Sequence, residues 1–193
     1  MAVDNQQDSN RQRRGPKKAT PERLEKSALF YLERFASSSE NLRRVLMRRV
    51  EASAREHGTD REEGAQFIDT LIERYQRAGL LDDAAYAEAR VASLHRRGLS
   101  DRAIAMKLRQ KGVPGDLIDQ SLENLREELA ADGVDPNWEA AMNYAKRRRI
   151  GPFRQTGRPE NRERDMAALG RQGFDYQTAR AIVDAEADTE TEH

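Results

Sequence analysis

Lysine and arginine gather in four clusters along this chain. The clusters are Arg43, Arg44, Arg48 and Arg49; Arg96 and Arg97; Lys107, Arg109 and Lys111; and Lys146, Arg147, Arg148 and Arg149. Helical residues four apart, such as Lys107 and Lys111, bring like charges onto one face, and a bound anion would relieve the repulsion. The clusters therefore predict a basic track suited to a long acidic partner, either a nucleic acid or a protein filament wrapped on one. All members except Arg49 are taken as binding candidates.

A second interpretation of the same clusters needs no ligand. Charged helix faces are commonly solvated, and cations in the last turn of a helix interact favourably with its dipole. Four consecutive charges, as in Lys146 to Arg149, sweep more than one helical turn, so only part of each cluster can line one surface. Both interpretations stay open for any single residue.

Catalytic and metal-binding chemistry finds few candidates. The chain has no cysteine and three histidines, His57, His95 and His193, which are far apart in sequence. It contains no HExxH pair, phosphate-binding glycine loop or Gly-x-Ser-x-Gly elbow. The adjacent Asp82 and Asp83 are better explained as helix caps. We therefore expect no catalytic residue, no bound metal, no cofactor and no enzymatic activity.

The composition favours helices packed in thin layers. Hydrophobic residues make up 37% of the chain and charged residues 35%, which leaves little apolar surface for one deep core. Aromatic residues are scarce, and alanine, leucine, arginine and glutamate dominate, a mixture typical of helical proteins. We predict an all-α fold. The net charge of zero argues against a dedicated, strongly basic nucleic-acid binder.

The two ends of the chain are polar and opposite in charge. Residues 1–19 are basic and residues 188–193 acidic, and both are predicted to be disordered tails. The basic end lacks the apolar run of a signal peptide, and no later window reaches the roughly 18 apolar residues of a membrane span. We expect a cytoplasmic protein that does not contact membranes and is compatible with a reducing compartment.

Helix-start and helix-stop signals define the elements. Thr20 and Asp135 each precede a proline at the first helical position, and Ser100 and Asp175 also stand where an N-cap is expected. Three starts carry particular expectations, namely a capping box from Ser37 to Glu40, a cap at Asp82 or Asp83, and a start at Pro114 or Asp116. Left-handed C-terminal caps are expected at Gly79, Gly98, Gly112 and Gly173.

Apolar residues at helical spacing predict which faces are buried. The first stripe runs from Leu24 to Phe35 on a helix expected to end near Ala36, and a later one places Trp138 in the core beside Ala141. Polar stretches at 56–64 and 154–161 are predicted to be loops.

The helix, glycine, helix pattern repeats at a nearly constant interval. Leu108 and Leu169 are 61 residues apart, as are Gly112 and Gly173. Because one unit has too few large apolar residues to be stable alone, stacked units that share apolar faces are favoured. We predict three tandem three-helix repeats at residues 20–80, 81–133 and 134–187, forming an elongated array.

One stretch is similar to a known family. Residues 79–113, "GLLDDAAYAEARVASLHRRGLSDRAIAMKLRQKGV", resemble the RecX family of recombinase regulators in "GLLDD", the following aromatic, "RRG" and "LRQKGV". The segments "FIDTLIERYQRAGL", "NWEAAMNYAKRRRIG" and "LGRQGF" extend the similarity over about residues 21–186. The resemblance implies a curved array of three three-helix repeats.

The resemblance also implies a partner and a function. Members bind the RecA recombinase in the groove of its nucleoprotein filament. They usually limit filament growth, ATP hydrolysis, strand exchange and co-protease activity in DNA repair, recombination and the SOS response. We expect this chain to be a monomer that binds the RecA filament, with at most weak DNA contact. The rival hypothesis is a helical module that binds nucleic acid directly through its basic face.

This chain departs from the family pattern in its first repeat. Arg49 and Val50 stand where a glycine stop is expected, and residues 51–64 enlarge the following loop. Both tails are extra. These differences put the geometry of the first repeat in question.

Overall fold

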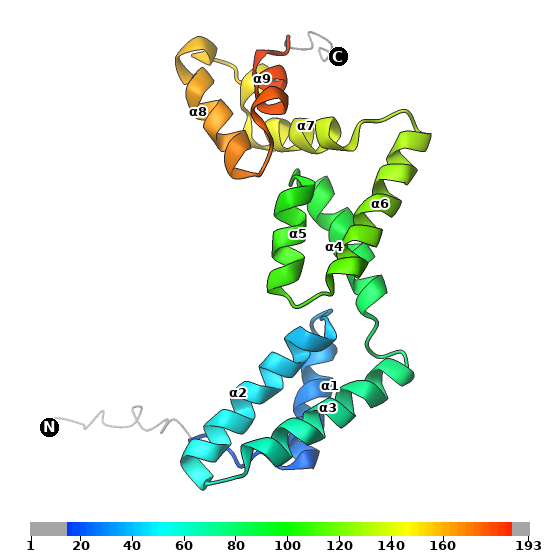
Figure 1. Cartoon of the computed structure of the whole chain (residues 1–193). Coiled ribbons are helices and arrows are strands. Elements are labelled where there is room, and N and C mark those ends of the chain that lie inside the picture. The colour runs from blue at the N-terminus through cyan, green and yellow to red at the C-terminus, as the bar shows by residue number, and fades with distance from the viewer. Residues whose placement is uncertain (1–14, 187–193) are drawn as a thin grey trace, which may run out of the picture. The chain divides into compact units, whose positions relative to one another are not determined.

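A computed structural model describes residues 15–186, which form nine α-helices and one 3-10 turn with no strand (Figure 1). The elements are α1 Pro21–Leu32, α2 Ser39–His57, α3 Arg61–Arg77, α4 Asp83–Arg96, α5 Asp101–Gln110, α6 Gly115–Ala131, α7 Pro136–Arg148, η1 Gly151–Phe153, α8 Arg158–Arg171 and α9 Tyr176–Asp184. The all-α prediction is confirmed. The predicted tails lie outside the described residues, except for residues 15–19.

The helices belong to two compact units. The N-terminal unit contains α1, α3 and α2 from Leu42 onward, and the C-terminal unit contains Ser37–Asn41 and the chain from Leu81 onward. The N-terminal core is formed by Leu24, Ala28, Leu42, Leu46, Val50, Ile68, Leu71, Ile72 and Tyr75, all buried. The exact repeat boundaries remain a prediction.

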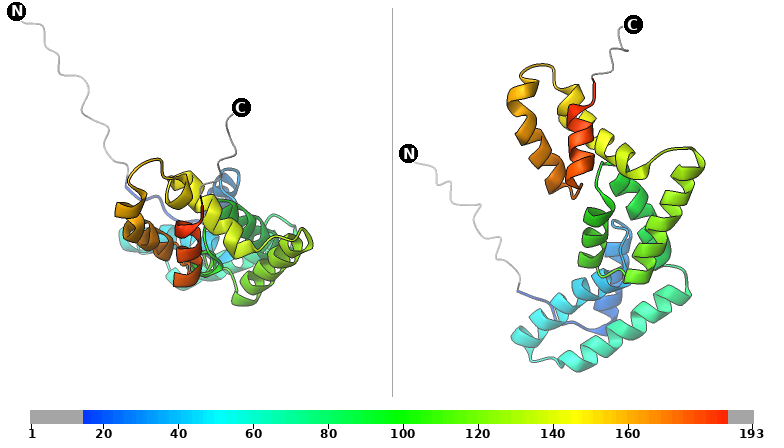
Figure 2. Two further views of the ribbon diagram at one scale, coloured as in Figure 1. Left: turned by 90° about the horizontal axis from the view of Figure 1, so that it is seen from above. Right: turned by 45° about the horizontal axis from the view of Figure 1, so that its top comes forward.

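The C-terminal unit has two hydrophobic clusters. One is formed by α4, α5 and α6, which pack together in both Figures 1 and 2, and it includes Ile104, Leu108 and Ile118. The other is formed by α7, α8 and α9 and includes Leu169 and Ile182. These apolar faces are narrow, because charged residues occupy the remainder of each helix.

Two close approaches join these clusters. Gly98 follows α4 with a φ of 74°, and a Cβ atom there would lie 2.5 Å from the backbone nitrogen of Tyr144 on α7. Gly173 has a φ of 90° and would place a Cβ 2.4 Å from the hydroxyl of Ser100. That hydroxyl donates to the Gln172 carbonyl at 2.8 Å. The C-terminal unit therefore needs glycine at both positions for conformation and for space.

Most of the predicted caps are confirmed. Thr20, Asp82, Ser100, Asp135 and Asp175 each accept a backbone N–H of the first helical turn. The predicted glycines 79, 98, 112 and 173 all have positive φ.

Pro114 occupies the N-cap position of α6 without a side-chain hydrogen bond. The predicted N-cap of α2, Ser37, is wrong by one position. The hydroxyl of Ser38 accepts from the backbone N–H of Asn41 at 3.2 Å. A run of three serines offers several equivalent hydroxyls, and the backbone conformation selects among them.

Three predicted boundaries are also wrong. Helix α1 ends at Leu32 rather than near Ala36, and the Phe35 side chain is 56% exposed. The loop predicted at 56–64 shrinks to residues 58–60, because Asp60 caps α3. The loop predicted at 154–161 contains the start of α8 at Arg158. In both loops helices begin within polar sequence, where apolar periodicity gives no signal.

Trp138 is 40% exposed and does not belong to the core of α7. Its helix buries Ala141, Tyr144 and Ala145 instead. Trp138 lies in the first turn, which contacts α4 through Pro136 and α9 through Asn137, but these contacts leave its own ring partly exposed. None of the described helices has the length and apolar content needed to cross a membrane.

Candidate functional site

A cationic pocket of about 370 Å³ lies in the C-terminal unit, between the α4–α6 and α7–α9 groups. We call it the C-terminal pocket. Its lining residues are Arg90, Leu94, Arg97, Leu99, Lys107, Tyr144, Arg147, Arg148 and Gln172. Five of these residues are cationic and none is acidic.

Helix geometry places the cations around this hollow. Arg90 and Arg97 are seven residues apart, so they lie about two turns apart on the same side of α4. Lys107 is in the last turn of α5, and Arg147 and Arg148 are in the last turn of α7. Because the C-terminal end of a helix carries partial negative charge, these helix ends lower the energy of gathering like charges.

The two interpretations of the clusters are therefore compatible in this pocket. The helix ends offset repulsion within the protein, but they do not supply a carboxylate counterion. Within residues 15–186, no ion pair to a carboxylate involves Arg97, Lys107 or Arg148. The guanidinium of Arg147 lies 5.9 Å from the ring centroid of Tyr144. The pocket can accept phosphate or carboxylate oxygens from a partner.

Contacts behind the pocket hold its two sides together. His95 is buried, and its Nε2 atom lies 2.8 Å from the Pro136 carbonyl oxygen at the start of α7. Its Nδ1 atom is 3.9 Å from a carboxylate oxygen of Glu139. Together with the Gly98 approach, these contacts fix α4 against α7 and so fix the spacing of Arg97 from Arg147.

A carboxylate also supports the chain just after α7. Arg154 donates to Asp165 at 2.6 Å, and the backbone N–H of Gly151 donates to Asp165 Oδ2 at 3.0 Å. Burial of Asp165 opposes its ionisation, but these hydrogen bonds prevail and hold the pKa of its carboxyl below the usual value. Ionised Asp165 thus anchors the turn that follows Arg147 and Arg148.

Other predicted site residues do not line this pocket. Arg43 pairs with Asp69 at 2.7 Å, and Arg44 also has a partner. Five more of the predicted binding candidates are exposed but lie outside the pocket, namely Arg96, Arg109, Lys111, Lys146 and Arg149. Lys111 accepts a hydrogen bond from Ser38 through its carbonyl, and Arg149 has a left-handed backbone with φ of 53°. Arg48 lines a different pocket in the N-terminal unit. Binding by these residues stays a prediction.

Arg90, Tyr144 and Gln172 were not expected at the pocket. Arg90 could have been found from its seven-residue spacing to Arg97, which places both on one side of a helix. Gln172 precedes the glycine of "RQGF", a phrase that resembles the earlier "RQKG". Its contact with Ser100, however, joins segments far apart in the sequence. Local sequence gives no signal for that contact.

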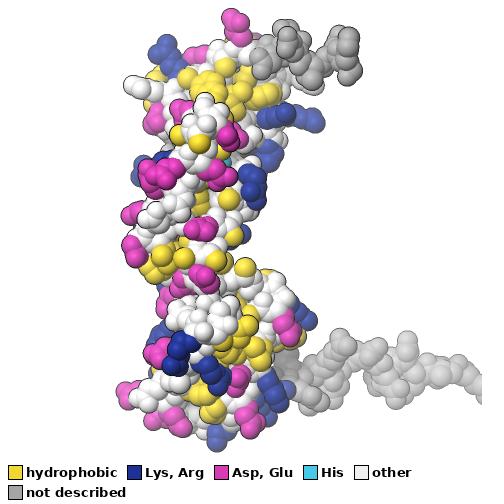
Figure 3. All heavy atoms as spheres, turned by 90° about the vertical axis from the view of Figure 1, so that its right-hand side faces the viewer, with side chains coloured by type: hydrophobic (Ala, Val, Ile, Leu, Met, Phe, Trp, Pro, Cys, Tyr) yellow, Lys and Arg dark blue, Asp and Glu magenta, His cyan; other side chains and the backbone are white. Residues whose placement is uncertain are grey.

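Surface charge in the C-terminal unit is unevenly distributed. The upper part of Figure 3 shows one face of this unit, on which acidic side chains gather toward one side and basic ones toward the opposite edge. Arg126 of this unit is matched to carboxylates, with Asp101 at 2.6 Å and Glu123 at 2.9 Å. Arg126 therefore differs from the pocket cations Arg97, Lys107 and Arg148, which have no carboxylate partner within residues 15–186.

These features define an all-helical protein of three-helix domains with a cationic pocket. Comparisons with known proteins agree. Residues 82–122 match the family described as "RecX, second three-helix domain". The regulatory protein RecX of Myxococcus xanthus is 41% identical over 172 residues, covering 88% of this chain and 89% of the relative. That of Thermobifida fusca is 34% identical and covers 67% and 66% of the two chains.

A solved crystal structure of regulatory protein RecX shares the fold. It aligns with a TM-score of 0.55 at 21% identity, covering 86% of this chain and 72% of the other. The chain belongs to the RecX family of regulatory proteins. The resemblance noted in the sequence is thereby confirmed.

Proposed function

We propose that this protein regulates the RecA recombinase by binding in the groove of the RecA–DNA filament. It acts there as a negative modulator of filament growth, ATP hydrolysis, strand exchange and co-protease activity in DNA repair and the SOS response. The observation that carries the proposal is the C-terminal pocket, where five cations face a hollow that no carboxylate lines. Membership of the RecX family supports the choice of partner.

The mechanism follows from differential affinity. A binder shifts a conformational equilibrium only to the extent that it binds the two states unequally. Cations held at a fixed spacing by α4 and α7 favour filament states that present acidic groups at a matching spacing. Binding to such a state would slow ATP turnover or block addition of the next recombinase subunit.

A charge-reversal pair tests the role of the pocket. Arg97→Glu with Lys107→Glu should weaken inhibition of recombinase ATPase on single-stranded DNA at least about tenfold, since close charge pairs at interfaces typically contribute more than 1.4 kcal/mol. The matched control is Arg96→Glu with Arg109→Glu, which changes the same charge on the same helices outside the pocket. Arg96 and Arg109 belong to the predicted basic clusters, but the proposed contact is made by the pocket, so we expect the control to remain within about threefold of the native protein.

Two results would contradict the proposal. Equal losses in both double variants would indicate a diffuse basic surface rather than the pocket. An unchanged ATPase rate at saturating native protein would remove the regulatory role itself.

A second candidate function is direct binding of nucleic acid at the same pocket. The absence of lining carboxylates favours any polyanion, including a phosphate backbone. Fluorescence anisotropy with labelled duplex DNA over a salt series distinguishes the two. Direct binding should weaken with a log–log slope of about −0.9 per neutralised phosphate. A regulator whose target is the recombinase should retain inhibition under conditions in which free DNA is not bound.

We further infer that the protein is not an enzyme and acts as a cytoplasmic monomer. Both described histidines are engaged by backbone carbonyls, His57 by Pro16 and His95 by Pro136. His193 lies outside the described residues. Size-exclusion chromatography with light scattering would test the monomeric state.

A further inference from the structure

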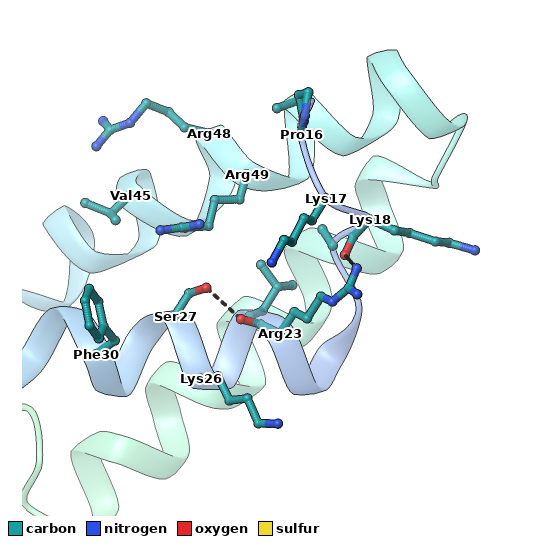
Figure 4. A pocket seen from close by; sticks show the side chains of 13 residues that line it. Pro16, Lys17, Lys18, Arg23, Lys26, Ser27, Phe30, Val45, Arg48 and Arg49 are labelled. Atoms are coloured by element: carbon teal, nitrogen blue, oxygen red, sulfur yellow. Dashed lines mark hydrogen bonds between the residues drawn. The ribbon is translucent and has the colours of Figure 1, made fainter. Parts of the chain in front are cut away.

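A second cationic pocket, of about 800 Å³, lies in the N-terminal unit (Figure 4). We call it the N-terminal pocket. Three parts of the chain line it, namely the segment before α1, α1 itself and α2. Its cationic residues are Lys17, Lys18, Arg23, Lys26, Arg48 and Arg49. No acidic residue lines it.

The segment that carries Lys17 and Lys18 is fixed at two points. The Pro16 carbonyl oxygen lies 2.7 Å from Nε2 of His57, and the Ala19 N–H donates to the hydroxyl of Ser53 at 2.9 Å. Ser53 is fully buried in α2. The two lysines therefore lie between anchored backbone groups, so their Cα positions are defined before any ligand arrives.

The wall formed by α1 is also ordered by internal hydrogen bonds. Arg23 Nη1 donates to the Lys18 carbonyl at 3.2 Å, and the Ser27 hydroxyl donates to the Arg23 carbonyl at 2.7 Å. Figure 4 draws both bonds. This arrangement brings positive charge from separate segments to one end of the hollow.

The cations of this pocket lack carboxylate partners. Within residues 15–186, no ion pair involves Lys17, Lys26 or Arg49. Elsewhere in the same unit Arg74 is paired with Glu25 at 2.5 Å. Because like charges at close range repel, a polyanionic ligand would lower the energy of this cluster.

The opposite end of the pocket carries apolar side chains beside cationic ones. Figure 4 shows Phe30 and Val45 at the end away from Lys18 and Arg23, with Arg48 and Arg49 extending toward the same end. Phe30 is 51% exposed, and the guanidinium carbon of Arg34 lies 3.8 Å from its ring centroid. An exposed aromatic ring with a stacked guanidinium is suited to contact with a planar base.

We propose that the N-terminal pocket binds a free nucleoside polyphosphate. The base contacts Phe30 and Val45, and the phosphates contact Lys17, Arg23 and Arg49. The volume lies within the range of roughly 300–1,000 Å³ for small-ligand sites. A ligand with one planar end and one polyanionic end matches a cationic pocket whose exposed ring lies away from Lys18 and Arg23, whereas a nucleic-acid strand presents evenly spaced charges along a track. The inference goes beyond regulation of the recombinase, because it gives the regulator a nucleotide input.

Binding of ATP to the protein alone tests this proposal. Isothermal titration with ATP, adenosine, inorganic triphosphate and a twelve-nucleotide single strand separates the contributions of base, phosphate and polymer. We expect ATP to bind more tightly than adenosine or triphosphate, and the oligonucleotide not to displace it. Recombinase is absent from this assay, so its outcome is independent of the proposed recombinase regulation.

Variants locate the site. The double variant Lys17→Glu with Arg49→Glu should weaken ATP binding at least about tenfold. The control is Arg55→Glu, which changes an exposed cation of α2 outside the pocket and should leave the affinity for ATP unchanged. Phe30→Ala should weaken ATP binding several-fold without affecting the binding of inorganic triphosphate. Circular dichroism and thermal unfolding of each variant check that the fold is intact.

Three results would overturn the proposal. One is no ATP binding by the native protein, and another is tight oligonucleotide binding that excludes ATP. The third is a Phe30→Ala variant that binds ATP like the native protein, which would remove the base contact.

Discussion

The two cationic pockets have similar charge but are built differently. In the C-terminal pocket the cations stand mainly at the ends of α4, α5 and α7, and packing between two groups of helices fixes their spacing. In the N-terminal pocket two lysines lie on an irregular segment tied to α2 by Ser53 and His57. Charge composition alone therefore does not define a site. The backbone contacts behind the cations do, and they are different in each unit.

The N-terminal pocket also has an exposed aromatic ring, which the C-terminal pocket lacks. Phe30 is half exposed at the former, whereas Leu94 and Leu99 at the latter are almost fully buried. A pocket with only charge and polar groups at its surface suits the acidic face of a large partner. A pocket with an additional exposed ring suits a ligand that has its own planar part. Substitutions should therefore affect the two pockets separately.

The largest expected effect comes from Gly98→Ala. Alanine would adopt an unfavourable left-handed conformation and meet the backbone of Tyr144 at 2.5 Å, so we expect a loss of about 3 kcal/mol or more in unfolding free energy. The α4–α7 contact should open and inhibition of the recombinase should fall, with ATP binding at the N-terminal pocket retained. Urea unfolding followed by circular dichroism measures the stability.

Gly79→Ala provides the control for that substitution. Gly79 has a φ of 71° but no atom within 4 Å of an added Cβ, so only the conformational term applies, about 1 kcal/mol. Equal losses at positions 79 and 98 would show that the close approach to α7 contributes nothing.

Asp165→Asn should destabilise the C-terminal unit by about 2 kcal/mol at pH 7, because it removes a charged acceptor shared by Arg154 and Gly151. The lowered pKa of this carboxyl sets the sign of the pH dependence. Its stabilisation is complete well above the ordinary aspartate pKa of about 4 and is lost as the pH falls from there through the lowered folded-state pKa. Urea unfolding from pH 7 to pH 3 should show a shallower loss in the variant.

Contacts between distant segments mark the limit of what the sequence could predict. Thr20 and Ser100 are predicted as caps, and Asp82 as one of two alternatives with Asp83, because a cap depends on its own residue and the next three. The positive φ at Gly98 was predicted for the same local reason. Its approach to Tyr144 was not, because it joins segments more than forty residues apart.

The candidate site shows the same division. The sequence located Arg97, Lys107, Arg147 and Arg148, because clustered cations are visible in the order of residues. It did not separate them from Arg43, whose charge is matched by Asp69 twenty-six residues away. Knowing which cations lack a carboxylate requires the packing of helices, and packing depends on non-local contacts. The Trp138 error has the same origin, since the contacts that this helix start makes with His95 and Thr178 join distant segments and leave the ring partly exposed.

Ser53→Ala tests the construction of the N-terminal pocket alone. The Ser53 hydroxyl accepts from Ala19 N and from the Thr59 hydroxyl at 2.8 Å, so its removal should cost about 1 kcal/mol. Because the segment carrying Lys17 and Lys18 loses an anchor, ATP affinity should fall roughly fivefold. Inhibition of the recombinase through the C-terminal pocket should be unchanged. Titration with ATP and recombinase ATPase assays on one preparation measure the two effects. A parallel loss of ATP binding and of recombinase inhibition would contradict the idea that the two pockets are built independently.

The smallest effect is expected for Arg43→Ala. Arg43 and Asp69 form a surface ion pair whose side chains are 36% and 50% exposed, so its loss should change stability by less than about 1 kcal/mol. It should also leave recombinase inhibition and ATP binding unchanged, because this charge is already matched within the protein. Arg97→Ala removes one positive charge as well but should reduce inhibition, since no carboxylate lines its pocket. If Arg43→Ala reduced inhibition as much as Arg97→Ala, total positive charge rather than carboxylate-free pockets would determine binding.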